Sequence, residues 1–217
     1  MKVLAILGSP RGARSQTRVL AEAVLAGAKE QGAEINVADL ATVRLEFCTA
    51  CEACHKGSQC SRNDAGCQIL EQMLAADGIV LASPVYLNQV TAQLKTLLDR
   101  TSKFIHCLRL MDKYLAAVTT SGGGGGAEAQ AFLRKYAVAA GAQFAGGVDA
   151  SVQLQETDLA AARKLGVALA VSIRDQTCDP AQLFAIEEQK KRFGRIVGSH
   201  RDSWAYEYKF WQDKGWL

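Results

Sequence analysis

The sequence predicts a three-layer α/β/α fold built around a five-stranded parallel sheet with strand order 2-1-3-4-5. Short apolar runs that are typical of buried strands alternate with segments in which apolar residues recur at helical spacing. The chain has 217 residues, of which 49% are hydrophobic, and this is enough for one such domain and a short extension. The alternation favours parallel pairing, because parallel neighbours are usually joined by a helix.

Apolar runs bounded by turn residues indicate the strands. The first run, at 2–7, ends at Gly8, and the third, at 78–82, is apolar throughout. A strand that is apolar on both faces is typical of a sheet covered by helices on both sides. The expected strands cover residues 2–7, 34–38, 78–82, 113–119 and 144–148.

The segments between and after these strands show helical periodicity. Gly32 closes the first expected helix and Gly141 the third. The last one carries Leu165, Leu169 and Ile173 on one face. The expected helices cover about residues 17–28, 90–105, 128–140 and 158–174.

This strand order determines where a ligand is expected. Strands 1 and 3 are neighbours whose helices leave on opposite faces, which opens a crevice at their carboxyl ends. The loops after residues 7, 82 and 119 should therefore meet there, with the loop after the second strand opening on the same edge.

The chain is expected to divide into a domain at 1–179 and an extension at 180–217. The extension is rich in charged residues and contains all three tryptophans. Its aromatic residues would form a costly exposed patch, so we expect them to be buried, either on their own domain or, as we favour, against a second copy of the chain. They are Trp204, Tyr206, Tyr208, Phe210, Trp211 and Trp216.

Composition and charge exclude several classes of protein. A hydrophobic fraction of 49% together with a charged fraction of 22% excludes a disordered chain, and a net charge of +3 gives no reason to expect a nucleic-acid partner. No apolar run is long enough to span a bilayer, and the run at 3–7 is too short for the core of a signal peptide. We therefore expect a cytoplasmic protein without a membrane partner.

The first loop has the composition of an anion site. It follows a strand and opens a helix, and it carries hydroxyls at Ser9, Ser15 and Thr17 and a cation at Arg11. Free amides and the helix dipole at such a position bind anions. The spacing matches neither a nucleoside-triphosphatase loop nor a dinucleotide fingerprint, so a terminal phosphomonoester fits better. The alternative is that these hydroxyls only cap the helix.

The other two loops could contact a planar ligand. Residues 83–89 place a proline and an aromatic ring directly after the buried third strand. The loop after the fourth strand contains five consecutive glycines at 122–126, which permit close approach of the backbone to a ligand or simply provide flexibility.

Together these segments resemble the flavodoxin-like NAD(P)H-dependent FMN reductase superfamily. The resemblance rests on GSPRxxxSxT at 8–17, SPVY at 83–86, Lys95 with the LDRT run at 98–101, and the glycines at 122–126. It implies a flavodoxin-like fold, non-covalent FMN and a homodimer or homotetramer. It also implies that the phosphate is held by Ser9, Arg11, Ser15, Gln16 and Thr17, that the isoalloxazine ring is lined by Pro84, Val85, Tyr86, Leu87 and Asn88, and that the pyrimidine side is closed by Thr120, Ser121, Gly122, Gly123 and Gly124.

A cysteine-rich loop at 48–60 follows the second strand. Cys48, Cys51, Cys54 and Cys60 have the spacing C-x2-C-x2-C-x5-C, and four thiolates so placed can ligate a 4Fe-4S cluster. The spacing resembles the compact motif of the iron–sulfur flavoproteins, a branch of the same superfamily. Other interpretations remain open: inert thiols, a structural Zn²⁺ site or a redox dithiol.

We also predict the surroundings of one histidine inside this loop and of three cysteines outside it. Cys67 is expected to be a buried helix residue, with a substitute cluster ligand as the alternative. His55 is expected to be a solvated loop residue rather than a ligand or proton relay. Cys107 and Cys178 are expected to pack as small apolar side chains.

The resemblance implies an FMN-dependent oxidoreductase that relays electrons between a 4Fe-4S cluster and FMN. Ferredoxin or NAD(P)H would be the electron donor, and a quinone, O2 or H2O2 the acceptor. Because the flavin supplies the redox chemistry, no catalytic side chain is expected. The alternatives are a cluster-free NAD(P)H-dependent FMN or quinone reductase and a non-enzymatic flavodoxin-like carrier or zinc-stabilised module.

Overall fold

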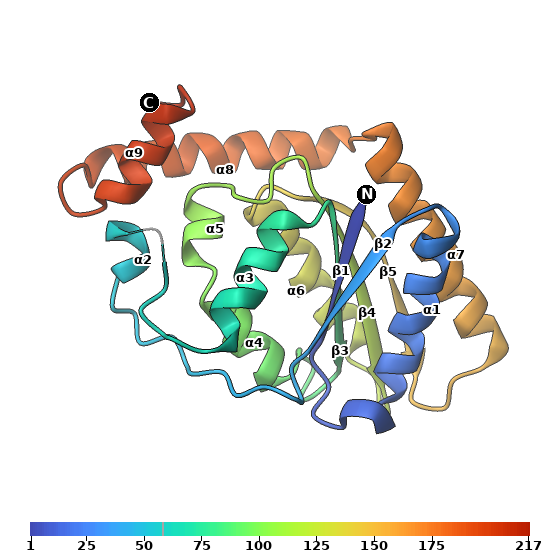
Figure 1. The fold of residues 1–217 in the computed structure, drawn as a ribbon. Coiled ribbons are helices and arrows are strands. Elements are labelled where there is room, and N and C mark those ends of the chain that lie inside the picture. The colour runs from blue at the N-terminus through green and yellow to red at the C-terminus, as the bar shows by residue number, and fades with distance from the viewer. Residues whose placement is uncertain (58) are drawn as a thin grey trace.

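The computed structural model describes residues 1–57 and 59–217; residue 58, inside the predicted cysteine loop at 48–60, lies outside the described residues. All pairings in the central sheet are parallel. The strand order β2-β1-β3-β4-β5 confirms the predicted fold class (Figure 1). The strands are β1 (Lys2–Leu7), β2 (Glu34–Asp39), β3 (Gly78–Pro84), β4 (Tyr114–Ser121) and β5 (Gln143–Ser151).

Helices cover both faces of the sheet, because alternate side chains of each central strand point to opposite faces. Val3 and Ala5 of β1 pack with α1 (Gln16–Glu30) and α7 (Glu156–Asp175). Leu4 and Ile6 pack in a second core, on the other face. That face is covered by α3 (Ala65–Ala75), α4 (Ala92–Asp99), α5 (Ser102–His106) and α6 (Gly126–Ala139).

Two glycines let α1 and α7 cross with their backbones in contact. A Cβ atom on Gly27 would collide with the carbonyl group of Arg163, and one on Gly166 would collide with the carbonyl group of Val24. The crossing therefore requires a residue without a side chain at both positions.

The helix predicted at 90–105 is two helices, α4 and α5. The hydroxyl of Thr101 donates a hydrogen bond to the carbonyl oxygen of Leu98 at 2.6 Å, and the Thr101 amide donates to the same carbonyl at 3.0 Å. A threonine hydroxyl that competes for a helix carbonyl favours a local break. Arg100 and Thr101 form this break.

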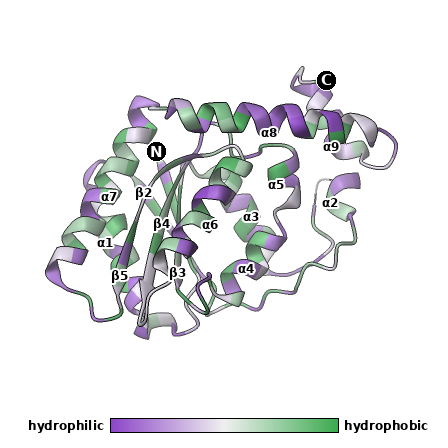
Figure 2. Cartoon of the chain, turned by 180° about the vertical axis from the view of Figure 1, so that it is seen from behind, coloured by the Kyte–Doolittle hydropathy of each residue, from purple (hydrophilic) through white to green (hydrophobic). Residues whose placement is uncertain are grey.

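The extension consists of α8 (Pro180–Ser199) and α9 (Ala205–Asp213), joined by a loop. Asp179 caps α8 by accepting hydrogen bonds from the amides of Ala181 and Gln182 at 2.8 and 3.2 Å. Hydrophobic and hydrophilic residues alternate along α8 (Figure 2). Across residues 1–57 and 59–217, every helix falls short of the length or the apolarity that a bilayer span demands.

The aromatic residues of the extension pack against their own chain. Trp211 is 1% exposed and lies in a third core with Phe193 and Cys107. This core lies where α8 and α9 pass the end of α5. A contact of the extension with a second copy of the chain stays a prediction.

Candidate functional site

The loop after β1 presents hydroxyl groups at the start of α1. Ser15 is the N-cap of α1, and its Oγ accepts a hydrogen bond from the amide of Arg18 at 3.2 Å. Ser9, Ser15 and Thr17 are almost completely buried, whereas Arg11 and Gln16 are exposed. The buried hydroxyls and the helix N-terminus form the polar base expected of a phosphate site, with the arginine free to close over it.

Three short hydrogen bonds join the loops after β1, β3 and β4. Thr17 Oγ1 and Thr120 Oγ1 are 2.6 Å apart. Thr91 Oγ1 donates to the carbonyl oxygen of Gly8 at 2.6 Å, and the amide of Val85 donates to the carbonyl oxygen of Thr120 at 2.8 Å. The three loops therefore form one unit at the carboxyl edge of the sheet (Figure 1).

The rim of this unit is exposed and built from tight turns. Tyr86 and Gln89 exchange backbone hydrogen bonds of 2.9 and 3.0 Å across Leu87 and Asn88, which both have positive φ angles. Leu87 is fully exposed and Tyr86 is 46% exposed. Such a projecting apolar turn can cover one face of a planar ring.

The glycine-rich loop lies against the same turn. A Cβ atom on Gly125 would lie 2.5 Å from Asn88 Oδ1, and the φ angle of Gly125 is +82°. Glycine at this position thus permits both the backbone conformation and the close approach. The predicted residues of this loop, Thr120, Ser121, Gly122, Gly123 and Gly124, run from the buried end of β4 to its exposed tip.

The cysteine loop leaves the end of β2, forms the short helix α2 (Ala53–Lys56) and returns to α3 (Figure 1). All its cysteines are free thiols. Cys48, Cys51, Cys54 and Cys60 line one cavity of about 280 Å³, together with residues at the α4–α5 break. Cys48 and Cys51 are exposed, and Cys54 and Cys60 are partly buried. The structure therefore brings all four predicted ligands to one cavity.

The thiols in this cavity differ in acidity. A hydrogen bond with Ser61, 3.0 Å from Cys51 Sγ, and a further one with the backbone of Ala53 lower the pKa of Cys51. Burial, reinforced by the charge of Glu207, raises the pKa of Cys54 to about 11. A metal ion that bound the Cys54 thiolate would therefore have to displace this proton.

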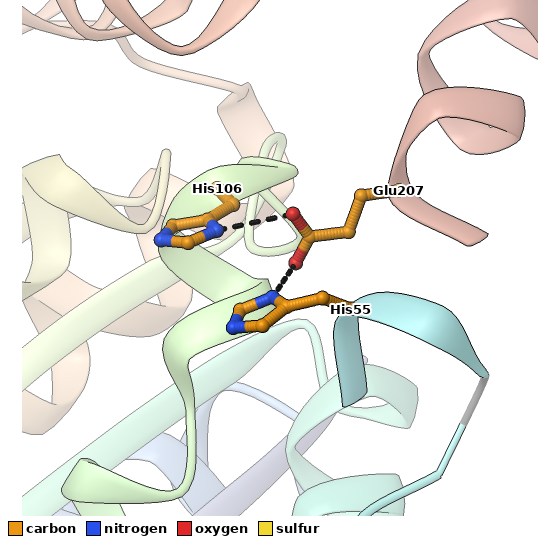
Figure 3. Close-up of side chains that lie close together, drawn as sticks. All are labelled: His55, His106 and Glu207. Carbon is orange, nitrogen blue, oxygen red and sulfur yellow. Dashed lines mark hydrogen bonds and ion pairs between the residues drawn. The ribbon is translucent and has the colours of Figure 1, made fainter. Parts of the chain in front are cut away.

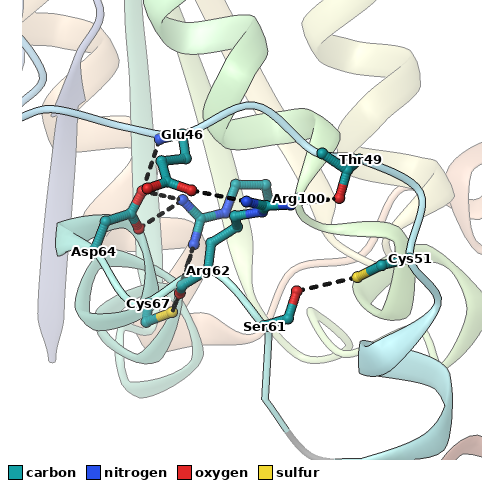
Figure 4. Close-up of polar contacts among 8 residues, drawn as sticks. All are labelled: Glu46, Thr49, Cys51, Ser61, Arg62, Asp64, Cys67 and Arg100. Atoms are coloured by element: carbon teal, nitrogen blue, oxygen red, sulfur yellow. Dashed lines mark hydrogen bonds and ion pairs between the residues drawn. The ribbon is translucent and has the colours of Figure 1, made fainter.

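Two arginines, whose polar contacts are drawn in Figure 4, line the same cavity. Arg100 Nη1 donates to both carboxylate oxygens of Asp64, at 2.6 and 2.7 Å. Arg62 donates to Glu46 at 2.9 Å and to Thr49 at 2.6 Å. Burial would raise the pKa of Asp64, but the hydrogen bonds it accepts and the charge of Arg100 lower it overall. The ion pair between Asp64 and Arg100 joins the start of α3 to the break between α4 and α5.

Cys67 lies on α3, outside the lining of this cavity. Its Sγ donates to the carbonyl oxygen of Arg62 at 2.7 Å and is 3.5 Å from Arg100 Nη2. It is partly buried on a helix, close to what was expected. Of the two remaining cysteines, Cys107 is buried as expected, but the expectation for Cys178 is wrong, because its thiol is exposed in the connection between α7 and α8.

The expectation that His55 is solvated is also wrong. Its side chain is 8% exposed because α9 covers it, and its Nδ1 lies 2.6 Å from Glu207 Oε1 (Figure 3). His106 Nδ1 lies 3.0 Å from the other carboxylate oxygen, and the ring of Trp204 stacks on both histidines. Burial would raise the pKa of Glu207, but the hydrogen bonds and charges of the histidines lower it overall.

Sequence reasoning missed this group and the role of Asp64. His55 and Glu207 are 152 positions apart, and Asp64 and Arg100 are 36 apart. No local pattern connects residues at such separations. The LDRT run at 98–101 was the one available signal, since it singles out Arg100 without giving its partner.

Comparison with known proteins assigns this chain to one family. Residues 1–157 match the family described as NADPH-dependent FMN reductase. An iron–sulfur flavoprotein of Archaeoglobus fulgidus is 26% identical over 222 residues, which span all of both chains. An iron–sulfur flavoprotein of Methanocaldococcus jannaschii is 41% identical over 118 residues, covering 54% of this chain and 61% of that one.

Solved structures show the same fold at low sequence identity. A flavone reductase superposes with a TM-score of 0.67 and 22% identity, covering 81% of this chain and 64% of the other. An NAD(P)H:quinone oxidoreductase from Methanothermobacter marburgensis gives a TM-score of 0.64 and 18% identity, covering 78% of this chain and 96% of the other. An apo NADH:FMN oxidoreductase gives a TM-score of 0.60 and 21% identity, covering 83% of this chain and 92% of the other.

Proposed function

Because the chain belongs to the NADPH-dependent FMN reductase family and is an FMN-dependent oxidoreductase, we propose that it is an iron–sulfur flavoprotein. In this proposal Cys48, Cys51, Cys54 and Cys60 hold a 4Fe-4S cluster that exchanges electrons with FMN. One observation carries the proposal: the four thiols line a single cavity of about 280 Å³. The full-length similarity to a protein named iron–sulfur flavoprotein supports it.

The size and polarity of the cavity fit a cluster better than a single metal ion. A water molecule occupies about 30 Å³ in the liquid, so 280 Å³ leaves room for a polynuclear group. A structural zinc ion would be closely surrounded by its four sulfurs. The Nε atoms of Arg62 and Arg100 are buried without a hydrogen-bond partner among the described residues. Such donors suit an anionic, sulfur-rich ligand.

For FMN, we propose that the buried hydroxyls of Ser9, Ser15 and Thr17 bind the phosphate, with Gln16 at the helix start and Arg11 closing over it from solvent. The turn from Pro84 to Asn88 would line the isoalloxazine ring, and the segment from Thr120 to Gly124 would close its pyrimidine side. The shared hydrogen bonds between the three loops support this, because they give one preorganised unit. The bound flavin supplies hydride and electron transfer.

A second candidate function is a cluster-free NAD(P)H-dependent FMN or quinone reductase. It is favoured by solved structures of this fold that are named NADH:FMN oxidoreductase and NAD(P)H:quinone oxidoreductase. The two candidates differ in the electron donor, which is ferredoxin in the first and NAD(P)H in the second. In both, the acceptor is a quinone, O2 or H2O2, and the active species is a homodimer or homotetramer.

Metal and flavin analysis after anaerobic purification tests the proposal. We expect about four irons and four sulfides per FMN. Replacement of Cys54 by Ser should remove the iron and leave the FMN, because Cys54 lies on α2, outside the three flavin loops. Cys178→Ser is the matched control, since this thiol is exposed outside the cavity, and it should leave both unchanged.

A flavin spectrum without iron under strict anaerobiosis would contradict the cluster. Rapid bleaching of the flavin by NAD(P)H in that preparation would then establish the second candidate. Reduction by ferredoxin with little bleaching by NAD(P)H, in an iron-loaded preparation, is the result expected for the first.

A further inference from the structure

Arg100 is completely buried, which is unusual for an arginine. The exposed fraction of its side chain is 0%, and that of its partner Asp64 is 11%. A buried guanidinium needs a counter-charge and acceptors for its donors, because the charge has been removed from water. The carboxylate of Asp64 supplies the charge, but it does not use all the donors.

Among the described residues, both Nη atoms of Arg100 have acceptors, but its Nε–H group has none. Nη1 donates to both oxygens of Asp64, and Nη2 approaches the carbonyl oxygen of Arg62 at 3.4 Å and Cys67 Sγ at 3.5 Å. Nε is buried and has no partner in the described chain. A buried N–H group without an acceptor is costly, so the geometry indicates a ligand beside Nε.

The chain is shaped to hold this guanidinium in place. Arg100 itself lies in the break between α4 and α5. A Cβ atom on Gly66 would lie 2.5 Å from Arg100 Nη1, so only glycine lets the first turn of α3 approach so closely. Asp64 is fixed by accepting from the amides of Glu46 and Gly66 at 2.7 and 3.0 Å.

Arg100 also lies on the cysteine side of its ion pair. It lines the cavity of the four cysteines, whereas Asp64 is not among the lining residues. Cys60 lines the same cavity, so the Arg100 cation has the Asp64 carboxylate as its ion-pair partner and a cysteine thiol in the cavity that it lines. Burial lowers the pKa of Arg100, but the hydrogen bond to Asp64 and the charges of Cys60 and Asp64 raise it overall.

We propose that Arg100 is a positioning residue for the cluster: its Nε–H donates to sulfur at the Cys60 corner, and its charge raises the cluster's reduction potential. This inference rests on the proposed function. Hydrogen bonds to cluster sulfurs and nearby positive charge stabilise the more negative reduced form, so both contributions act in the same direction.

Redox titration of the iron-loaded protein tests this role. Arg100→Met should make reduction of the cluster at least tenfold less favourable, which is about 59 mV more negative for one electron. Arg100→Lys keeps a charge but loses Nε, so its potential should shift in the same direction by less. Asp64→Asn removes the counter-charge and should shift the potential the opposite way. Arg174→Met, on α7 with a half-exposed side chain, is the control and should leave it unchanged.

A second readout isolates the hydrogen bond. The Fe–S stretching bands in the resonance Raman spectrum should shift when the protein is transferred to D2O, and Arg100→Met and Arg100→Lys should each reduce that shift. Equal potentials and equal isotope shifts in all iron-loaded variants would overturn the inference. If Arg100→Met fails to retain iron, Arg100→Lys and Asp64→Asn decide the question. A wild-type protein without iron would instead contradict the proposed function.

Discussion

Thr91 is a single side chain that links two of the flavin loops. It is fully buried at the start of α4, where its Oγ1 accepts from the amide of Leu94 at 3.3 Å and donates to the carbonyl oxygen of Gly8 at 2.6 Å. Its own amide donates to Ser83 Oγ at 2.9 Å. One hydroxyl thus caps a helix and fixes the first residue of the phosphate loop.

Replacing Thr91 by Val should destabilise the protein and weaken FMN binding. The shape is kept, but the carbonyl of Gly8 and the amide of Leu94 lose their partner, which costs about 2 kcal/mol for buried groups. Urea unfolding and FMN titration of the apoprotein measure the two effects. Thr96→Val, at a buried threonine inside α4, is the matched control. Unchanged FMN affinity in Thr91→Val would show that the loop holds its shape without this bond.

At the scale of elements, the crossing of α1 and α7 depends on the absence of two side chains. We expect Gly27→Ala to destabilise the protein by about 2 kcal/mol or more, because the added methyl group collides with the carbonyl group of Arg163. Gly198→Ala in α8 is the control, since its Cβ would meet Leu217 at 3.6 Å, an ordinary contact. That change should be slightly stabilising, as alanine favours a helix. Equal effects of both changes on urea unfolding would refute this account.

Most elements could be predicted from hydrophobic periodicity alone. The first strand was predicted with its observed bounds, and the long helix predicted at 158–174 differs by one or two residues at each end. The helix predicted at 90–105 was wrong as a single element. Periodicity shows only which face of a helix is apolar, and the apolar pattern continues from α4 into α5. The break between them coincides instead with the hydrogen bond that the Thr101 hydroxyl donates to Leu98.

At the scale of the whole molecule, the sequence predicted which loops meet at the edge of the sheet. It did not predict the polar contacts that connect the cysteine loop to the rest of the protein. Parallel strands end at one edge, so the three flavin loops could be grouped from topology. The contacts of Asp64 with Arg100 and of Glu207 with His55 depend on where α3, α5 and α9 settle in three dimensions. Buried polar pairs of this kind give no periodic signal in the sequence.

Glu207 of α9 binds His55 of the cysteine loop, and the contribution of this contact to the free energy of unfolding should depend on pH. Glu207→Gln should cost about 2 kcal/mol at neutral pH, because a buried carboxylate that accepts from two histidines is lost. The pKa of Glu207 is lowered by folding. Its contribution is therefore complete above its unfolded pKa of about 4.3 and is lost as the pH falls through the lower folded value.

Urea unfolding from pH 7 to pH 3 measures this contribution as the difference between wild type and Glu207→Gln. The difference should shrink as the pH falls below about 5, where the carboxylate becomes protonated. Glu188→Gln is the control, because Glu188 forms an exposed ion pair with Lys191. A difference that grows in acid would contradict the assigned direction.

The position of Glu207 in the chain also bears on how the protein is made. Residues leave the ribosome in order, at about 5–20 per second. The 152 positions between His55 and Glu207 therefore correspond to a delay of roughly 8 to 30 seconds. From Cys60 onward the nascent chain carries all four thiols of the cysteine loop, but the carboxylate of Glu207, which later binds His55 of this loop, has not yet been synthesised.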